Sequence, residues 1–363
     1  MITTTLLSVF IISTFAAVLA AIIVLADKFI ANYGECTVTI NTDKKFSLEG
    51  GVSLLESLIQ EKVFIPSACG GKATCGYCKV KVLDGAGPLL PTEEPYLDKK
   101  ERADSIRLSC QVKVRNDIDI YIPEELLSVQ EFTCTCVDIK DMTYDIKQFR
   151  FKLEEPDTMN FIPGQYVQFF APSVHGSEEV YRAYSIASNP IDKNHIELII
   201  RLVPDGICTT YCFEHLKVGD TVKLNGPYGD FRLADTDAPI LFIAGGSGMA
   251  PIKCMLHHMK NTNNQREAQY FFGGNTERDL FLINEIRKEF ESSLNFKIIP
   301  VVATPQNGYI GEKGFVTHAV ERNVKDAVNT EAYLCGSPGM IDACINVLTS
   351  LGMTENNVFY DKF

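Results

Sequence analysis

The sequence predicts a multidomain chain with an amino-terminal transmembrane helix, a small β-rich domain, an antiparallel β-barrel and an α/β doubly wound domain. Three observations predict it. The first 26 residues carry no charged side chain. Short strand-like runs with Gly and Pro turns fill the middle of the chain, and beyond Ala238 apolar strand-like runs alternate with helical segments. We expect the four parts to span residues 1–30, 31–130, 131–235 and 236–363.

Length and charge restrict the function. A chain of 363 residues exceeds one ordinary core, since domains hold roughly 100–200 residues. The net charge of −12 argues against nucleic acid as a partner, because phosphate binding rewards clustered Lys and Arg. Twelve cysteines are present, and those outside the motif described below show no disulfide spacing, which favours a reducing compartment.

The amino-terminal segment fits a single membrane span. Leu6–Ala26 is mostly apolar and long enough to cross about 30 Å of hydrocarbon as a helix. A cleaved signal peptide is the alternative, but no positive charge precedes the run and the run is longer than a signal peptide's apolar core. Lys28, Lys44 and Lys45 follow the span, which places the rest of the chain in the cytoplasm.

Four cysteines lie in a pattern suited to an iron–sulfur cluster. Cys69, Cys75 and Cys78 are separated by five and two residues in a Gly-rich loop, and Cys110 follows after thirty-one. A 2Fe-2S cluster takes four thiolates, and plant-type ferredoxins space them by four, two and a long interval. A zinc site and ordinary buried thiols are the alternatives. Zinc sites usually pair two arms of ligands, whereas here one CxxC precedes a solitary Cys.

The segments around this loop resemble the β-grasp fold of 2Fe-2S ferredoxins. Alternating apolar residues predict a strand at 36–41, and Ser53 heads an amphipathic helix over 54–59. Beyond the cysteine loop, strands are expected at 79–83 and 118–122, with a short helix opening near Pro91.

The predicted barrel contains two features that suit a flavin dinucleotide. Arg182 and Tyr184 alternate on one strand and therefore share a face, which offers a guanidinium for phosphate and an aromatic ring for a flat heterocycle. Gly206, Thr209 and Thr210 open a helix, where free N–H groups and hydroxyls suit a pyrophosphate. A barrel strand followed by an N-capped helix is the alternative interpretation of the hydroxyls.

The last part has the layout of a dinucleotide-binding sheet. An apolar run over 239–244 leads into Gly245, Gly246 and Gly248, and further buried strands are expected at 268–272, 296–302 and 333–335. The glycine pattern is not GxGxxG. Ligands of parallel sheets bind beyond the carboxyl ends of the strands, where both the glycine turn and Cys335 fall.

Taken together, these features resemble the ferredoxin–NADP reductase superfamily, and within it the family of F subunits of sodium-translocating NADH:quinone reductases. The resemblance rests on the apolar amino-terminal run, the cysteine spacing, the ending Val358–Phe363 and five motifs. The motifs are Arg-Ala-Tyr-Ser (182–185), Gly-Ile-Cys-Thr-Thr-Tyr (206–211), Gly-Pro-Tyr-Gly-Asp-Phe (226–231), Gly-Gly-Ser-Gly-Met-Ala-Pro (245–251) and Cys-Gly-Ser-Pro-Gly-Met (335–340).

This resemblance implies site residues for FAD and NADH. For FAD it implies that Arg182 binds phosphate, Tyr184 covers the isoalloxazine, Ser185 approaches the reactive N5, and Gly206, Thr209 and, more weakly, Thr210 hold the pyrophosphate. For NADH it implies that Gly246 and Gly248 make room for phosphates and Cys335 lies where nicotinamide meets flavin. Phe363 would shield the other flavin face. Ser185, Tyr184 and Cys335 are thus the expected catalytic group.

The chain departs from this family in three places. The connection between Gln165 and Arg182, through His175 and Gly176, is shorter than the insertion expected there. Ser337 replaces a Pro. Asn275 stands where Arg is frequent, and together with Glu277 it disfavours a 2′-phosphate, although Arg278 lies nearby.

The expected function is conversion of electron number. NADH gives two electrons, a 2Fe-2S cluster accepts one, and a flavin exchanges both. We expect a single-pass subunit of the bacterial inner membrane whose integral membrane partners reduce quinone and whose complex couples this to sodium transport. The alternatives are the reductase component of an oxygenase, which generally lacks a span, and an anchored electron carrier without nucleotide chemistry.

Overall fold

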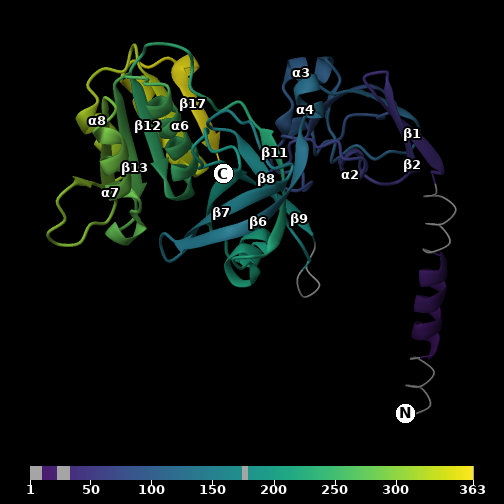
Figure 1. Ribbon diagram of the computed structural model, residues 1–363. Coiled ribbons are helices and arrows are strands. Elements are labelled where there is room, and N and C mark those ends of the chain that lie inside the picture. Colours follow the sequence, from purple (N-terminus) through teal and green to yellow (C-terminus); the bar gives the residue numbers. More distant parts are fainter. Residues whose placement is uncertain (1–9, 23–32, 174–178, 363) are drawn as a thin grey trace. The chain divides into compact units, whose positions relative to one another are not determined.

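The computed structural model describes residues 10–22, 33–173 and 179–362, which divide into two compact units, Met1–Ser128 and Val129–Phe363 (Figure 1). In the first unit, a helix over residues 10–22 has exposed side chains throughout. Among the described residues, no helix is both long and apolar enough to cross a membrane. The predicted span Leu6–Ala26 extends at both ends into residues outside the described part.

The remainder of the first unit is a mixed five-stranded sheet in the order β2-β1-β5-β3-β4. β1 and β5 pair in parallel, and the other neighbours are antiparallel. The strands are β1 (Glu35–Ile40), β2 (Lys44–Glu49), β3 (Lys79–Asp84), β4 (Ile106–Leu108) and β5 (Ile118–Tyr121). This strand arrangement, with one main helix across it, is that of the predicted β-grasp.

Helix α2 (Leu54–Gln60) covers this sheet. Ser53 caps it by accepting a hydrogen bond from the Glu56 N–H at 3.2 Å, as the sequence predicts. Leu54 and Leu58 are fully buried against the inward side chains of β1 and β5. The smaller helices are η1 (Glu94–Tyr96), α3 (Lys99–Ala103) and α4 (Glu124–Leu127).

The second unit begins with the predicted antiparallel barrel, six strands in the order β10-β7-β6-β11-β8-β9. A bridge between Ile186 and Leu198 joins its two outer strands. The strands are β6 (Gln130–Asp141), β7 (Ile146–Glu155), β8 (Tyr166–Ala171), β9 (Val180–Ser185), β10 (His195–Arg201) and β11 (Thr221–Tyr228). Between β10 and β11 lie the short helix α5 (Ile207–Thr210) and a π-helical turn η2 (Tyr211–His215).

A six-stranded parallel sheet follows, in the order β15-β14-β13-β12-β16-β17, which confirms the predicted doubly wound fold. From β12 the chain first adds β13, β14 and β15 on one side and then β16 and β17 on the other. The strand order therefore switches between β12 and β16, and ligands bind at such switch points. The strands are β12 (Ile240–Gly245), β13 (Ala268–Gly274), β14 (Phe296–Val302), β15 (Glu312–Lys313), β16 (Glu331–Gly336) and β17 (Val358–Lys362). The helices are η3 (Gly246–Gly248), α6 (Met249–Asn261), η4 (Glu277–Asp279), α7 (Ile283–Ile286), η5 (Arg287–Glu291), α8 (Val316–Asn323), α9 (Pro338–Ser350) and η6 (Glu355–Asn357).

The two faces of this sheet carry separate cores, because alternate side chains of a strand point to opposite faces. Phe242 and Tyr333 lie in the core that α6 covers. Ile243 and Leu334, one residue further along each strand, lie in the core with α8 and α9. Both runs are therefore continuous apolar segments, as buried parallel strands are.

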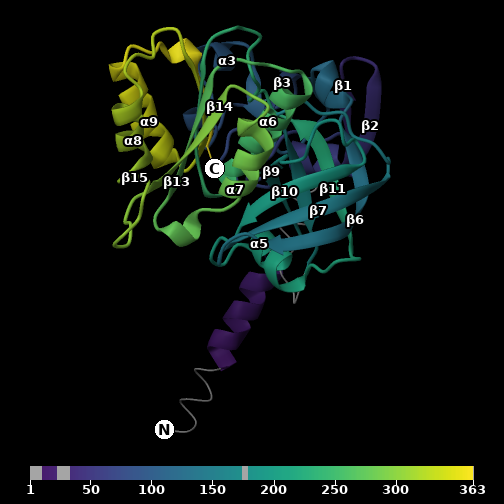
Figure 2. The same ribbon diagram turned by 60° about the vertical axis from the view of Figure 1, so that its left-hand side comes forward.

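Barrel and sheet are joined firmly within the second unit. Helix α6 lies beside β10 (Figure 2), where Lys253 forms an ion pair with Glu197 at 2.6 Å. The connecting loop is held by a buried ion pair between Arg266 and Glu331, also at 2.6 Å. Arg266 donates to the carbonyls of Ala234 and Ala238, so the guanidinium fixes the loop that leaves the barrel.

Candidate redox sites

The cysteine loop of the first unit is shaped by residues in the left-handed region of backbone conformation. Gly70, Gly71 and Gly76 have φ values of 63°, 83° and 72°. A Cβ at position 76 would lie 2.8 Å from the Tyr96 ring, so glycine is required there for space as well. The Ser67 hydroxyl accepts a hydrogen bond from the Gly71 N–H at 3.0 Å and fixes the start of the loop.

The four thiols of the motif, Cys110 after β4 included, form two pairs. The sulfurs of Cys69 and Cys75 are 3.4 Å apart, and Cys78 is hydrogen-bonded to Cys110. A single zinc ion needs four ligands converging on one point, whereas a 2Fe-2S cluster takes two thiolates on each iron. Within the described part of the chain, no three His, Cys, Asp or Glu side chains are grouped to hold one ion.

The hydrogen bond within each pair lowers the pKa of one thiol and raises the pKa of its partner, Cys75 or Cys78. The hydrogen bond from Cys75, with further bonds from the Thr74 and Cys75 amides, lowers the pKa of the Cys69 thiol to about 4. The bond to Cys78, the Gln111 side chain and the Ala73 amide lower the pKa of Cys110 to about 7. Because a 2Fe-2S cluster takes two thiolates on each iron, the two pairs of cysteines fit this cluster.

Strand β9 and helix α5 bring the predicted flavin residues together. The Tyr184 hydroxyl donates to Cys208 Sγ at 3.3 Å, and its ring packs edge-on against Phe169. One Arg182 nitrogen donates to the Tyr181 carbonyl at 2.7 Å, and the other nitrogens make no hydrogen bond with the described residues. Arg182 also lowers the pKa of Cys208, after the larger effect of a hydrogen bond from Cys212. The guanidinium therefore lies near α5 and fits a phosphate there.

The hydroxyl of Thr209 is used inside its own turn. Its Oγ1 lies 3.2 Å from the Val203 N–H and the Val203 carbonyl, and the side chain is buried. A Cβ at Gly206 would lie 2.7 Å from this oxygen. Thr209 and Gly206 therefore shape the turn. Thr210 donates its N–H to the Gly206 carbonyl, and the predicted helix is only four residues long before it widens.

A contact between the barrel and the last strand of the sheet joins the predicted catalytic residues. The Ser185 hydroxyl donates to Asp361 Oδ2 at 3.3 Å. Cys335 pairs in register with Asp361 on the neighbouring strand, and its side chain is fully buried. Burial raises the pKa of Asp361 to about 6, opposed in part by the bond from Ser185. Sequence reasoning missed Asp361, although the chain ending that contains it is one of the features that carry the resemblance.

The glycine turn after β12 has two different requirements. Gly246 has a φ of 57°, which favours glycine. At Gly248, by contrast, a Cβ would lie 2.3 Å from the Cys335 carbonyl oxygen. Gly248 thus makes room for the end of β16, where the sequence analysis expected room for phosphate.

Sequence reasoning also missed Arg201, at the end of β10. Its Nε donates to Asp145 at 2.7 Å, and its Nη1 lies 3.7 Å from where a Cβ of Gly246 would be. The two terminal nitrogens make no hydrogen bond with the described residues. A guanidinium from the barrel is therefore available at the glycine turn of the sheet, where it fits a pyrophosphate.

The loop after β13 carries an acidic acceptor. Glu277 accepts a hydrogen bond from the Gln306 N–H at 2.8 Å, and its other oxygen is buried without a partner among the described residues. A carboxylate accepts hydrogen bonds from ribose hydroxyls and repels a phosphate. Arg278 lies over the Tyr144 ring at 4.0 Å.

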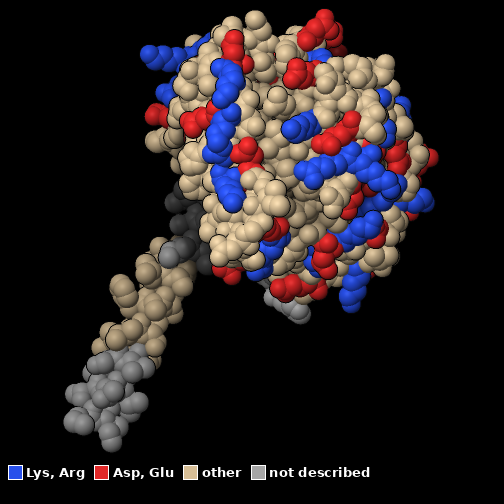
Figure 3. Space-filling model, turned by 90° about the vertical axis from the view of Figure 1, so that its left-hand side faces the viewer, with Lys and Arg blue, Asp and Glu red and all other residues tan. Residues whose placement is uncertain are grey.

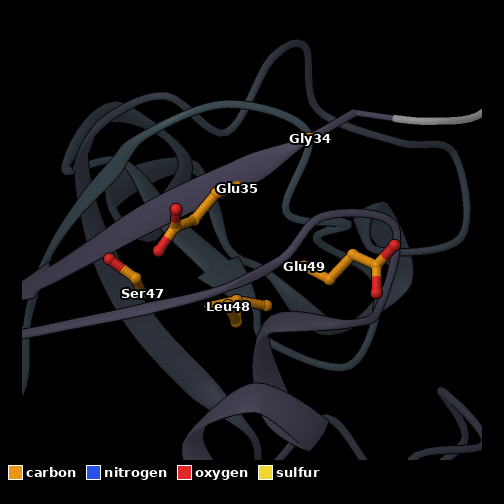
Figure 4. Close-up of a pocket in the computed structure, with 5 residues that line it drawn as sticks. All are labelled: Gly34, Glu35, Ser47, Leu48 and Glu49. Atoms are coloured by element: carbon orange, nitrogen blue, oxygen red, sulfur yellow. The ribbon is translucent and has the colours of Figure 1, made fainter.

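Other surface features do not add to these sites. Phe363, His175 and Gly176 lie outside the described residues. A cavity of about 420 Å³ in the first unit is lined by Gly34, Glu35, Ser47, Leu48 and Glu49, none of them predicted site residues (Figure 4). On the face shown in Figure 3, Lys and Arg are interspersed with Asp and Glu.

Family models match three parts of the chain. They are a 2Fe-2S iron–sulfur cluster binding domain over residues 38–115, an oxidoreductase FAD-binding domain over 133–233 and an oxidoreductase NAD-binding domain over 242–345. The chain is therefore an oxidoreductase with all three domains, in the predicted order.

Solved structures share the fold. A cytochrome P450 reductase of Amycolatopsis is 27% identical with a TM-score of 0.71, covering 90% of this chain and 98% of that one. The ferredoxin reductase of a carbazole 1,9a-dioxygenase is 24% identical with a TM-score of 0.69, covering 91% and 98%.

Curated relatives match along nearly the whole chain. The F subunit of the Na⁺-translocating NADH-quinone reductase of Idiomarina loihiensis is 34% identical over 391 residues, covering 95% of this chain and 96% of the relative. The corresponding protein of Neisseria meningitidis is 33% identical over 389 residues, with the same coverage. The chain belongs to the family of F subunits of Na⁺-translocating NADH-quinone reductases.

Proposed function

We propose that this chain is the NADH-oxidising subunit of a membrane respiratory complex. It takes two electrons from NADH onto FAD and passes them one at a time to a 2Fe-2S cluster held by Cys69, Cys75, Cys78 and Cys110. Integral membrane subunits then receive them for quinone reduction, coupled to sodium transport. The apolar segment Leu6–Ala26 anchors the chain in the bacterial inner membrane, with the redox domains in the cytoplasm.

The observation that carries this proposal is the hydrogen bond between Ser185 and Asp361. It joins the barrel strand that holds Arg182 and Tyr184 to the carboxyl edge of the nucleotide sheet, beside Cys335. Hydride transfer needs two rings held face to face more than it needs acid–base groups. A barrel site and a sheet site that meet at one point supply that positioning.

The residues around this point divide the binding work. Arg182 and the first turn of α5 hold the FAD phosphates, and Thr209 and Gly206 keep that turn in shape. Arg201 and the turn at Gly246 hold the NADH pyrophosphate. Glu277 accepts from a ribose hydroxyl and so favours NADH over NADPH. When bound, FAD supplies the exchange between two-electron and one-electron transfer.

Two measurements on the purified full-length chain and its membranes test the proposal. Anaerobic NADH is expected to bleach the flavin and then give the electron paramagnetic resonance (EPR) signal of a reduced 2Fe-2S cluster. Quinone reduction is expected only when integral membrane subunits co-purify with the chain. Reduction of the flavin without the cluster signal would contradict the electron route.

The structural likeness to a P450 reductase keeps one alternative in view, a reductase that serves an oxygenase. The same preparation separates the two functions. NADH oxidation that is stimulated by a soluble hydroxylase fraction, and not by the membrane subunits, would favour the alternative.

Replacing Asp361 by Asn is expected to slow NADH-driven flavin reduction by roughly 10- to 100-fold, less than the loss of an oxyanion-hole donor costs. Nicotinamide gains positive charge as NADH gives up hydride, and an ionised Asp361 stabilises that charge. Because the pKa of Asp361 is raised to about 6, the wild-type rate should rise with pH through that value. Stopped-flow reduction between pH 5 and 8 measures it.

The same raised pKa predicts the effect on stability. A carboxyl group whose pKa is raised in the folded state does not change the free energy of unfolding at pH values below its ordinary pKa. It lowers that free energy as the pH rises through its folded-state pKa. Asp361→Asn should therefore unfold at a higher temperature than wild type at pH 8, and at the same temperature at pH 4. Asp342→Asn, at an exposed carboxylate paired with Lys362, is the control and should keep the wild-type pH profile. An unchanged profile in Asp361→Asn would remove the assigned role.

A further inference from the structure

Ser109, which precedes the last cysteine of the cluster motif, is fixed against another ligand of the motif. Its N–H donates to the Cys78 carbonyl at 2.8 Å, and its carbonyl accepts from the Leu55 N–H at 3.0 Å. The residue follows directly after β4, whose last residue, Leu108, pairs with Lys79 of β3. The first of these bonds holds Ser109 beside Cys78, and its side chain is completely buried.

The hydroxyl of Ser109 has no hydrogen-bond partner among the described residues of the chain. A buried hydroxyl without a partner is costly and therefore uncommon in native proteins. The side chain that the hydroxyl approaches is that of Cys78. Because the hydroxyl is buried and no other acceptor among the described residues is within its reach, the Cys78 sulfur is the acceptor available to it.

We propose that the Ser109 hydroxyl donates a hydrogen bond to the Cys78 sulfur in the cluster-bound protein and raises the reduction potential of the cluster. The inference rests on the ligand set proposed above. Reduction adds one electron, supplied by the flavin, and increases the negative charge on the sulfurs. A donor beside a sulfur therefore stabilises the reduced form more than the oxidised form. No bond forms or breaks, and the proton stays on the hydroxyl.

This bond would ease the passage of single electrons out of the flavin. Cys110 already has a side-chain donor, because Gln111 Nε2 lies 3.7 Å from its sulfur. Ser109 adds a side-chain donor on Cys78, which is the most buried of the four ligands and lies away from solvent donors. Ser109 is a positioning residue, because it acts through a ligand and touches no substrate.

The test is a redox titration of the full-length chain with cluster and FAD bound, followed by the EPR signal of the reduced cluster. Ser109→Ala is expected to shift the midpoint potential of the cluster to a lower value, and Ser109→Thr, which keeps the hydroxyl, to restore it. Ser57→Ala is the matched control. Ser57 is equally buried in the same unit, but its hydroxyl donates to the Ser53 carbonyl at 3.0 Å, so the potential should not move.

Each outcome decides the question. A wild-type potential in Ser109→Ala, or a lowered potential that Ser109→Thr does not restore, would overturn the proposal. Loss of the cluster in Ser109→Ala with FAD retained would also overturn it, because a hydroxyl that only adjusts the potential is not needed to hold the cluster. A wild-type chain without any 2Fe-2S signal would instead refute the ligand set itself.

Discussion

Replacing Cys75 by Ala is expected to abolish the 2Fe-2S cluster while leaving reduction of FAD by NADH at the wild-type rate. Cys75 would share one iron with Cys69, whose sulfur is 3.4 Å away, and its removal would leave that iron with one protein ligand. Removing a residue that hydrogen-bonds to a metal ligand lowers metal affinity or activity roughly 10- to 100-fold, and removing a ligand itself should have a larger effect. Cluster content by absorbance and EPR, flavin reduction by stopped flow, and quinone reduction are the three measurements.

Loss of the cluster with unchanged flavin reduction is expected because the chain divides into two compact units. The cysteine loop lies in Met1–Ser128, whereas the residues assigned to FAD and NADH lie in Val129–Phe363. NADH-dependent reduction of ferricyanide should therefore persist in Cys75→Ala as quinone reduction disappears. Cys36→Ala is the control, because Cys36 is a buried thiol in the same unit outside the motif. Slow flavin reduction in Cys75→Ala would show that the second unit depends on the cluster.

Features fixed by nearby residues could be predicted from the sequence. The cysteine spacing and its glycines give a loop whose conformation is local, and Cys69 and Cys75 come together within it. Cys110 reaches Cys78 because β4 pairs with β3. The apolar runs of β12 and β16 likewise identified the parallel sheet. A strand that is buried on both faces is apolar at successive positions, and this pattern can be recognised within each strand alone. The membrane span remains a prediction, because its ends lie outside the described residues.

Features that depend on contacts between distant segments could not be predicted from the sequence. Ser185 and Asp361 are 176 positions apart, and no pattern in the sequence around Asp361 indicates that it contacts a barrel strand. Only the pairing of β17 with β16 carries Asp361 to that point. Arg201 was missed likewise, because its approach to Gly246 depends on how barrel and sheet are docked.

Side-chain direction is the third limit. The hydroxyl at Thr209 suggested a pyrophosphate ligand from its place at a helix start, yet the fold turns it toward Val203. The role of Gly248 could not be predicted from its position in the sequence either. A glycine in a nucleotide-binding turn serves phosphate approach or close packing of chain segments, and the sequence does not say which.

Gly248→Ala tests which of these requirements applies at that turn. The added Cβ would lie 2.3 Å from the carbonyl oxygen and 2.8 Å from the carbonyl carbon of Cys335. Both contacts are with backbone, which cannot swing away as a flexible side chain can. Overpacking of this kind costs roughly 1–3 kcal/mol, and we expect the upper end because a strand has to move. Thermal unfolding of the second unit measures the loss.

The displaced strand end gives the variant a second effect that phosphate crowding would not give. Moving Cys335 also moves its neighbour Asp361 relative to Ser185, so flavin reduction should slow even at saturating NADH. Crowding of phosphate alone would raise the KM for NADH and leave the maximal rate and the unfolding temperature unchanged. Gly273→Ala is the control, since Gly273 lies near the end of the adjacent strand β13 and its nearest contact would be an ordinary 3.5 Å to Val316. A Gly248→Ala chain as stable as Gly273→Ala, with only KM changed, would return Gly248 to the phosphate role.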